Sequence, residues 1–292
     1  MTAVTVHDTR PCHLGEGPLW HPERNTLYWF DITAGRLLWR DGAEMRQHQF
    51  DRMVSAAGWI DAKRLLIAGE TGLFAFDLDT ATRTLVCAIE ADQPGTRSND
   101  GRADPHGGFW IGTMGKGGEP GAGALYRYYR GTLRKLGEGF TTPNSLCFAA
   151  DGRTAFFSDT RRRTVWRQAL SPVDGWPVGD PEVFLDLRPG TADGERRPDG
   201  AVIDAEGCLW SAQWGSARVA RYSPDGALLS TIALPASHTS CPAFGGEALD
   251  RLFVTTAQQN LSPEHLAQEP LAGQTFVIDG AGRGRPEPAV TL

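Results

Sequence analysis

The chain has 292 residues, of which 40% are hydrophobic and 22% charged, and this composition excludes an intrinsically disordered protein. Its formal net charge of -6 argues against a nucleic-acid-binding surface, which needs a concentrated positive face. No apolar run approaches the roughly 18 residues of a membrane span, and the first ten residues lack the basic and apolar regions of a signal peptide. We therefore expect a cytoplasmic protein with no nucleic-acid partner and no membrane partner.

Glycine and proline are common, with 35 and 19 residues and no period of three, so the composition favours many turns between short strands. The five cysteines are scattered along the chain and form no CxxC pair. An odd, dispersed set disfavours both a disulfide framework and a zinc–thiolate site. We predict that the following are all free thiols: Cys12, Cys87, Cys147, Cys208 and Cys241.

Six segments repeat one layout, in which a polar turn leads into a short strand of aromatic or aliphatic residues. Successive segments lie 38 to 54 residues apart when these positions are taken as equivalent: Leu27, Leu65, Phe109, Ala155, Leu209 and Leu252. Strand-only repeats of about 40 to 50 residues are typical of a β-propeller with one four-stranded blade per repeat. The sequence therefore predicts an all-β, six-bladed β-propeller that spans residues 1–292 as one domain. Two β-sandwiches with coincidental spacing are the alternative, which six units in register disfavour.

The two ends of the repeat series carry further expectations. A strand near residues 3–8 is expected to pair with C-terminal strands and so complete the last blade. One short helix is expected at residues 262–266, because Ser262 can cap it and Pro263 suits its first helical position.

The common catalytic motifs are absent from the sequence: it contains no GxSxG elbow, no phosphate-binding GxxxxGK[ST] loop, no HExxH and no EF-hand spacing. Four polar residues, Glu16, Asn99, Asn144 and Asp199, instead precede the aromatic strand of their repeats by 10 or 11 residues. Equivalent positions of successive blades lie at one height around the channel, so these side chains should meet at one of its mouths. Asn, Asp and Gly are also ordinary turn residues, but four matching offsets favour a site.

Glu16, Asn144 and Asp199 offer two carboxylates and one amide oxygen. Oxygen donors suit a hard divalent ion such as Ca²⁺, Mg²⁺ or Mn²⁺, with water in the remaining positions. Three protein ligands leave coordination sites open, which is typical of a catalytic metal. We therefore predict a metal site at one mouth of the central channel.

Several motifs of the sequence resemble those of the SMP-30/gluconolactonase/regucalcin family of six-bladed propellers, and of its bacterial sugar lactonases in particular. They include residues 15–20 (GEGPLW), 97–101 (RSNDG), 143–145 (PNS) and 198–200 (PDG). The resemblance implies that Glu16, Asn144 and Asp199 hold one divalent metal, which could be calcium, zinc, magnesium, manganese or iron. It also implies that Asp199 is the catalytic base.

The same resemblance implies that Arg97 and Asn99 contact the substrate, and that Glu119, on the loop before Gly123, is a further contact. A metal-bound carboxylate has a lowered pKa, so the assignment of Asp199 as the base conflicts with its role as a ligand, and a metal hydroxide is the alternative. Family members hydrolyse sugar lactones, so the expected partner is a small sugar lactone, either gluconolactone or a pentonolactone such as arabinonolactone or xylonolactone.

Two other functions stay open. One is metal-dependent hydrolysis of organophosphates or other esters, and the second is a calcium-binding regulatory role without catalysis. A monomer is expected, because a closed ring of blades leaves no sheet edge that must pair with a second copy.

Overall fold

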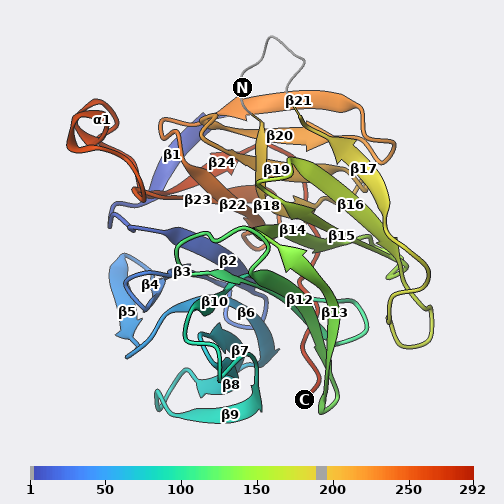
Figure 1. Cartoon of the computed structure of the whole chain (residues 1–292). Helices are drawn as coiled ribbons and strands as arrows, with labels where there is room; N and C mark the ends of the chain where they lie inside the picture. The colour runs from blue at the N-terminus through green and yellow to red at the C-terminus, as the bar shows by residue number, and fades with distance from the viewer. Residues whose placement is uncertain (1–2, 189–195) are drawn as a thin grey trace.

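The computed structural model describes residues 3–188 and 196–292, which form six four-stranded antiparallel sheets around a central channel (Figure 1). The predicted all-β, six-bladed propeller is therefore confirmed. Blade 1 contains β2 (Gly15–His21), β3 (Thr26–Asp31), β4 (Arg36–Asp41) and β5 (Glu44–Gln49). Blade 2 contains β6 (Val54–Asp61), β7 (Arg64–Gly69), β8 (Gly72–Asp77) and β9 (Arg83–Ala88). Blade 3 contains β10 (Thr96–Ala103), β11 (Phe109–Gly115), β12 (Gly123–Tyr129) and β13 (Thr132–Phe140). Blade 4 contains β14 (Pro143–Phe148), β15 (Thr154–Asp159), β16 (Thr164–Ala169) and β17 (Glu182–Asp186). Blade 5 contains β18 (Arg197–Ile203), β19 (Leu209–Trp214), β20 (Arg218–Tyr222) and β21 (Leu228–Ala233). Blade 6 contains β22 (Thr239–Gly245), β23 (Arg251–Thr256), β24 (Thr275–Asp279) and β1 (Ala3–Asp8).

The ring closes where the N-terminal strand joins the last blade. β1 pairs with β24 in antiparallel register, with Ala3 opposite Asp279 and Val6 opposite Phe276. This pairing confirms the expectation for residues 3–8. The short helix is also confirmed: α1 (Pro263–Gln268) begins after Ser262, whose hydroxyl accepts a hydrogen bond from the His265 amide, and it lies outside the ring (Figure 1).

The predicted repeat corresponds to one strand of each blade. All six equivalent positions fall in the first two residues of a second strand, namely β3, β7, β11, β15, β19 and β23. Nearly all residues of these strands are buried, which explains why their sequences are nearly continuous runs of apolar residues.

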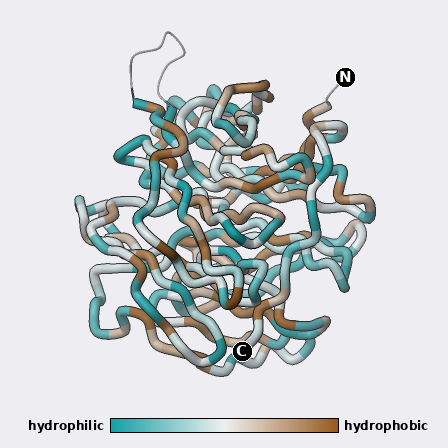
Figure 2. The backbone as a smooth tube through the Cα atoms, turned by 90° about the vertical axis from the view of Figure 1, so that its right-hand side faces the viewer, coloured by the Kyte–Doolittle hydropathy of each residue, from teal (hydrophilic) through white to brown (hydrophobic). Residues whose placement is uncertain are grey.

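The apolar core fills the space between neighbouring blades. Phe30 of blade 1 packs in one cluster with Ile67 of blade 2, and Trp210 of blade 5 packs with Phe244 of blade 6. Figure 2 shows hydrophobic and hydrophilic stretches alternating along the backbone. Contact between faces of adjacent sheets therefore sets the ring geometry and holds the inner strands around the channel.

The last thirteen residues form no strand but cross one mouth of the channel. The Gly284 amide donates to the Leu249 carbonyl of blade 6 at 2.7 Å, and the Val290 amide donates to the Trp59 carbonyl of blade 2 at 2.8 Å. The Val290 side chain is buried in the cluster between blades 2 and 3. We call residues 283–291 the C-terminal strap, since this segment ties blades on opposite sides of the ring together, which the sequence did not predict.

All five cysteines are free thiols, as predicted. Among the helices of residues 3–188 and 196–292, none is long and apolar enough to span a membrane.

Candidate functional site

A register shift near the start of each inner strand shapes the channel mouth opposite the strap. The shifts fall at Glu16/Leu19, Ser98/Gly101, Asn144/Cys147 and Pro198/Ala201 in blades 1, 3, 4 and 5, and at Val54/Ala56 and Thr239/Cys241 in blades 2 and 6. A bulge of this kind turns a side chain away from the regular alternation of the strand. The bulged positions carry the polar residues of the site: Glu16, Ser55, Asn99, Asn144, Asp199 and Ser240.

Backbone conformation supports two of these bulges. Gly17 follows Glu16 with φ of 53°, and a Cβ there would lie 2.3 Å from the Ser55 carbonyl oxygen, so only glycine fits. Ser145 follows Asn144 with φ of 59°, an uncommon conformation for a residue with a side chain. The Ser145 hydroxyl donates to the Asp199 carbonyl at 2.5 Å, which offsets the cost of this conformation and joins blades 4 and 5.

A row of hydrogen bonds connects the polar side chains across three blades. Arg97 Nη1 donates to Asn99 Oδ1 at 2.9 Å, and Asn99 Nδ2 donates to Asn144 Oδ1 at 2.8 Å. Asn144 Nδ2 then donates to Asp199 Oδ1 at 2.6 Å. All four side chains are buried. The structure therefore brings together four residues that lie up to 102 positions apart in the chain, and three of them, Asn99, Asn144 and Asp199, belong to the set with equal offsets.

Three buried carboxylates lie close enough to perturb one another. Burial and the nearby Asp100 charge raise the pKa of Glu16 to about 8. Burial, followed by the charges of Glu16 and Asp100, raises the pKa of Asp199 well above its usual range. Burial also raises the pKa of Asp100 to about 6, against a hydrogen bond that its carboxylate accepts from the Leu146 amide. Desolvation disfavours the charged form of each acid, and each charge adds to the cost of the others.

Arg97 is the cation that faces these acids. Burial lowers its pKa to about 10, while attraction to Glu16 and Asp199 opposes that shift. When all three acids are ionised they carry more negative charge than Arg97 offsets, and Arg102, which attracts Asp100, is already paired with Glu287. A divalent cation would supply the missing charge, and carboxylate and amide oxygens are suitable donors for it. The residues present therefore fit a divalent ion.

The Asn144 amide is not oriented for binding a cation together with Asp199. Asn144 directs its amide nitrogen toward Asp199 and Thr160, and its oxygen toward Asn99. Ligation by the Asn144 oxygen beside Asp199 needs a half-turn of the amide, which exchanges two ends of nearly equal size. Within the described residues, no group of three or more His, Cys, Asp or Glu side chains has metal-binding geometry. The proposed ligand set of Glu16, Asn144 and Asp199 includes an amide, so it is not a group made only of these four residue types.

Glu119 lies at the same mouth but outside the hydrogen-bonded row. It is exposed on the loop between β11 and β12, and its Oε2 accepts a hydrogen bond from the Gly117 amide at 3.1 Å. The loop begins at Gly115, which pairs with Thr96 directly before Arg97. The structure thus places Glu119 near the end of β10 that begins with Thr96 and Arg97, without a hydrogen bond to Asn144 or Asp199 among the described residues.

Sequence reasoning missed two residues that contribute to this site. Asp100 stood inside the recognised RSNDG motif, and only its burial and its effect on Glu16 reveal that it is a third acid of the site. Thr160 accepts a hydrogen bond from Asn144 Nδ2 at 2.8 Å and donates to the Pro198 carbonyl at 2.7 Å. It follows a second strand, so the offset from the aromatic strand could not identify it.

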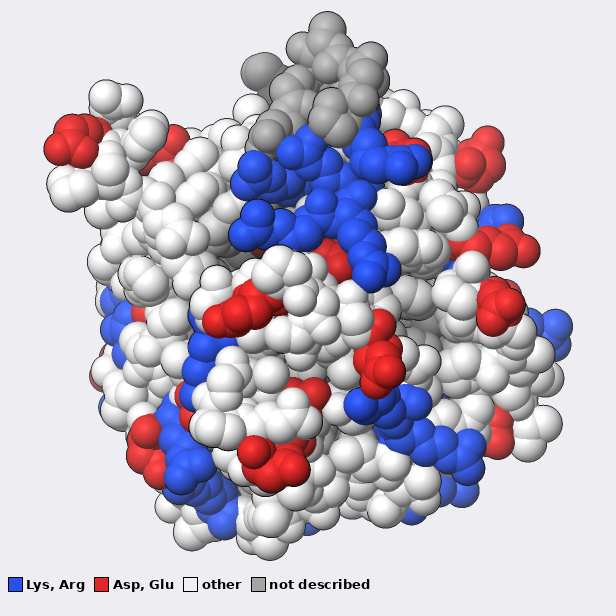
Figure 3. All heavy atoms as spheres, viewed as in Figure 1, with Lys and Arg blue, Asp and Glu red and all other residues white. Residues whose placement is uncertain are grey.

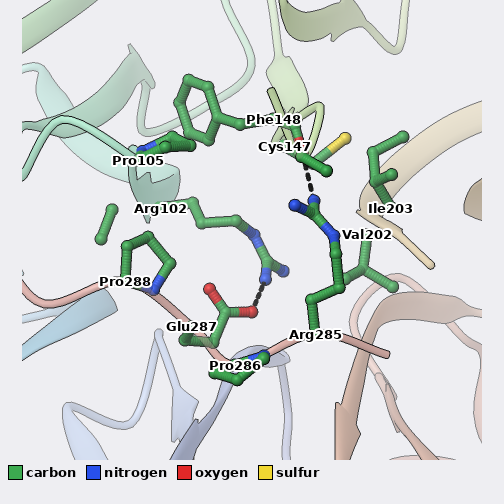
Figure 4. A pocket seen from close by; sticks show the side chains of 12 residues that line it. Arg102, Pro105, Cys147, Phe148, Val202, Ile203, Arg285, Pro286, Glu287 and Pro288 are labelled. Carbon is green, nitrogen blue, oxygen red and sulfur yellow. Dashed lines mark hydrogen bonds and ion pairs between the residues drawn. The ribbon is translucent and has the colours of Figure 1, made fainter. Parts of the chain in front are cut away.

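The opposite mouth holds a cavity of about 190 Å³ against the C-terminal strap (Figure 4). Arg102, at the far end of β10, forms an ion pair with Glu287, and Arg285 Nη2 donates to the Phe148 carbonyl at 2.7 Å. The carboxylate in this cavity is therefore already paired, and the acids available for chemistry lie at the first mouth.

The fold and site define a six-bladed propeller with buried acids and amides at one channel mouth, and the comparisons with known proteins agree. Residues 14–258 match the family model described as SMP-30/Gluconolactonase/LRE-like region. A putative sugar lactone lactonase of Rhizobium meliloti is 40% identical over 96% of this chain and 94% of its own length. An L-arabinolactonase of Azospirillum brasilense is 36% identical over 94% of this chain and 91% of its own length. This chain belongs to the SMP-30/gluconolactonase family.

A solved structure gives the same result. The calcium-binding protein regucalcin of Agrobacterium tumefaciens superimposes with a TM-score of 0.96 at 39% identity, covering 99% of this chain and 98% of its own. The family expected from the sequence motifs is thereby confirmed.

Proposed function

We propose that this protein is a metal-dependent lactonase that hydrolyses a sugar lactone to its aldonic acid, with gluconolactone or a pentonolactone such as arabinonolactone or xylonolactone as substrate. The observation that carries this proposal is the buried row from Arg97 to Asp199 beside Glu16. The relatives named as sugar lactone and arabinolactone hydrolases support the same substrate class.

Glu16, Asn144 and Asp199 would hold one divalent cation, and oxygen donors of this kind accept calcium, magnesium or manganese, with zinc and iron as further candidates. A bound cation would polarise the lactone carbonyl and stabilise the negative charge that develops on its oxygen. Arg97 and Asn99 would orient the substrate. Arg97 has guanidinium N–H donors that suit sugar hydroxyls and the ring oxygen, whereas Asn99 donates both of its amide hydrogens to Asn144 and the Pro143 carbonyl and would accept a hydrogen bond from a sugar hydroxyl through Oδ1.

Asp199 would serve as the general base. Burial raises its pKa well above the usual range, which makes the carboxylate a stronger proton acceptor than an exposed aspartate. Cation binding acts in the opposite direction, so the two effects offset and reduce the conflict between the roles of ligand and base. Asp199 would take a proton as water attacks the carbonyl carbon. The bond between that carbon and the ring oxygen then breaks, and the proton passes to the leaving oxygen.

The test is a turnover assay with gluconolactone, arabinonolactone and xylonolactone under several divalent ions. We expect hydrolysis that is lost on chelation and restored by one or more ions, with an unchanged far-UV circular dichroism spectrum, because interblade packing holds the fold. Asp199→Asn should lower kcat by about 10²-fold or more. Asp151→Asn, on an exposed turn at the far end of blade 4, is the matched control and should keep full activity. Full lactonase activity of the chelated protein would contradict the metal role.

Calcium binding without catalysis is the second candidate. The calcium-binding regucalcin at 39% identity favours it, together with the buried carboxylates of Glu16 and Asp199, whose raised pKa values indicate that their negative charges are poorly compensated within the site. Calcium binding measured by calorimetry, combined with no turnover of any lactone under any ion, would replace the lactonase proposal with this one. We further propose that the protein acts as a cytoplasmic monomer, and its five free thiols are consistent with a reducing compartment.

A further inference from the structure

We propose that Arg161 forms a subsite for an anionic group on the substrate, so that the preferred lactone carries a carboxylate, sulfonate or phosphate away from its ring carbonyl. This inference rests on the proposed lactonase function and specifies its substrate class. Its basis is the turn between β15 and β16, residues 160–163, which lies at the same mouth as Asp199.

The first observation is how closely this turn joins the site. Thr160 makes hydrogen bonds to Asn144 and to the carbonyl of Pro198, the residue before Asp199. The Arg161 amide donates to the buried Asp159 carboxylate at 3.0 Å, which fixes the backbone of the turn. Arg161 is therefore the next residue along a backbone that is held against the candidate cation ligands.

The second observation is the direction of the Arg161 side chain. A Cβ atom built on Gly118 would lie 3.9 Å from Arg161 Nη2 and within 4 Å of nothing else outside its own neighbours. The guanidinium thus extends from blade 4 toward the blade 3 loop that carries Glu119. Arg161 is exposed, and its guanidinium makes no hydrogen bond or ion pair to residues 3–188 and 196–292.

The third observation is the charge of the surroundings. Arg161, Arg162, Arg163, Thr164 and Arg188 line a shallow hollow on this side of the molecule. Arg162 lies 3.5 Å from the Asp159 carboxylate, and Arg188 pairs with Asp186 at 2.5 Å. Those two guanidiniums are matched by acids, whereas Arg161 has no such partner among the described residues. Figure 3 shows Lys and Arg gathered near the middle of this face.

These observations favour an anionic ligand at the mouth. The C-terminal strap and the Arg102–Glu287 ion pair cross the far mouth of the channel, so a lactone whose carbonyl lies by Asp199 would extend its remaining carbons outward. A guanidinium binds carboxylate, sulfonate or phosphate through two parallel hydrogen bonds, and such charge-assisted bonds are the stronger class. A divalent ion would offset the negative charge of the buried acids, so that Arg161 can attract an anion at the mouth.

The experiment compares kcat/KM for neutral gluconolactone with kcat/KM for three charged relatives: glucarolactone, sulfonated gluconolactone and phosphogluconolactone. The three distinguish which anion the subsite accepts. For wild type we expect at least one charged lactone to be preferred, with a preference that weakens as salt rises. In Arg161→Gln the ratio of charged to neutral kcat/KM should fall by roughly 10- to 100-fold. Arg161→Lys should retain part of the preference, because it keeps the charge and loses the planar fork.

Arg153→Gln is the matched control, since Arg153 is an exposed arginine on the turn before the same strand β15, about 20 Å away at the opposite face. Its ratio should stay within twofold of wild type. An unchanged ratio in Arg161→Gln, or an equal fall in Arg153→Gln, would overturn the inference. Turnover of the neutral lactone without any charged preference would also overturn it while leaving the lactonase proposal intact. No turnover of any lactone would refute the lactonase proposal itself.

Discussion

Asn144 donates a hydrogen bond from Nδ2 to Oδ1 of Asp199 at 2.6 Å, across the boundary between blades 4 and 5. The carboxylate therefore meets an N–H group at the point where a shared cation would need an oxygen from Asn144. Cation binding and this hydrogen bond are alternatives, because the amide must turn by half a rotation to exchange its ends. Two of the side chains that would ligate the ion, Asn144 and Asp199, therefore hydrogen-bond to each other when no ion is bound.

The first prediction concerns Asn144→Ala. Loss of one of three proposed ligands should weaken divalent-ion binding at least tenfold, since the ion loses a protein oxygen and Asp199 loses its hydrogen-bond partner. Titration calorimetry with Ca²⁺ and Mn²⁺ measures this directly. Gln47→Ala, which removes an exposed amide on β5, serves as the control and should bind ions as wild type does. Equal affinities in the two variants would remove Asn144 from the ligand set.

The second prediction separates substrate contact from ion binding. Asn99→Ala should raise KM for the lactone more than it lowers ion affinity, because Asn99 is bonded to Asn144 and Arg97 and faces the mouth. We expect KM to rise about tenfold, the effect of one lost hydrogen bond to the substrate, with ion affinity changed by less than threefold. A matching loss of ion affinity and activity would identify Asn99 as a ligand.

The third prediction is a pH dependence of the metal-free protein. The pKa of Glu16 is about 8 in the folded chain and 4.5 as its ordinary value, so at pH 7 the folded protein holds a proton that the unfolded chain has lost. Stability from this group is complete below pH 4.5 and is lost as pH rises through 8. Between pH 7 and 8.5 the loss is about 1 kcal/mol, or about 2 °C in Tm.

Thermal unfolding of chelated protein at pH 7 and pH 8.5 tests this. Burial lowers the pKa values of His7, His21, His48 and His238, so these four of the seven histidines titrate below this range. Glu16→Gln removes the titrating group and should show a smaller decrease in Tm than wild type. With a saturating divalent ion the decrease should shrink as well, since the ion stabilises the ionised carboxylate. An identical pH response in wild type and Glu16→Gln would show that the Glu16 pKa is not raised.

The fourth prediction concerns the ion pair between Arg102 and Glu287 under the C-terminal strap. Their side chains are only 10% and 9% exposed, so Glu287→Ala leaves a buried guanidinium without its partner. Such a change costs about 3–5 kcal/mol of unfolding free energy. Glu182→Ala breaks an exposed pair with Arg167 and should cost less than about 1 kcal/mol. Denaturant unfolding of both variants measures the difference, and equal midpoints would mean that the strap does not stabilise the ring.

The sequence by itself determined the architecture and most of the site. The buried second strand of each blade is a short run of apolar residues, so the spacing of Leu27, Phe109 and Leu209 indicated the blade period without any long-range information. A propeller places equivalent positions at one height, and the four matching offsets therefore sufficed to bring Glu16, Asn99, Asn144 and Asp199 to one mouth.

Tertiary structure decided what no local pattern encodes. Asp100 became a third acid of the site only because a bulge in β10 buries it beside the charges of Glu16 and Asp199, which come from other blades. The C-terminal strap has no sequence periodicity that would identify it. Its amides donate hydrogen bonds to carbonyls of loops and strand ends more than 30 residues away. The sequence presents Arg161 as one of three surface arginines. Its position depends on the neighbouring Thr160, which accepts a hydrogen bond from Asn144 of the same blade and donates one to the Pro198 carbonyl of blade 5. Local composition specifies strands, whereas burial, charge coupling and cross-blade hydrogen bonds exist only once the ring has closed.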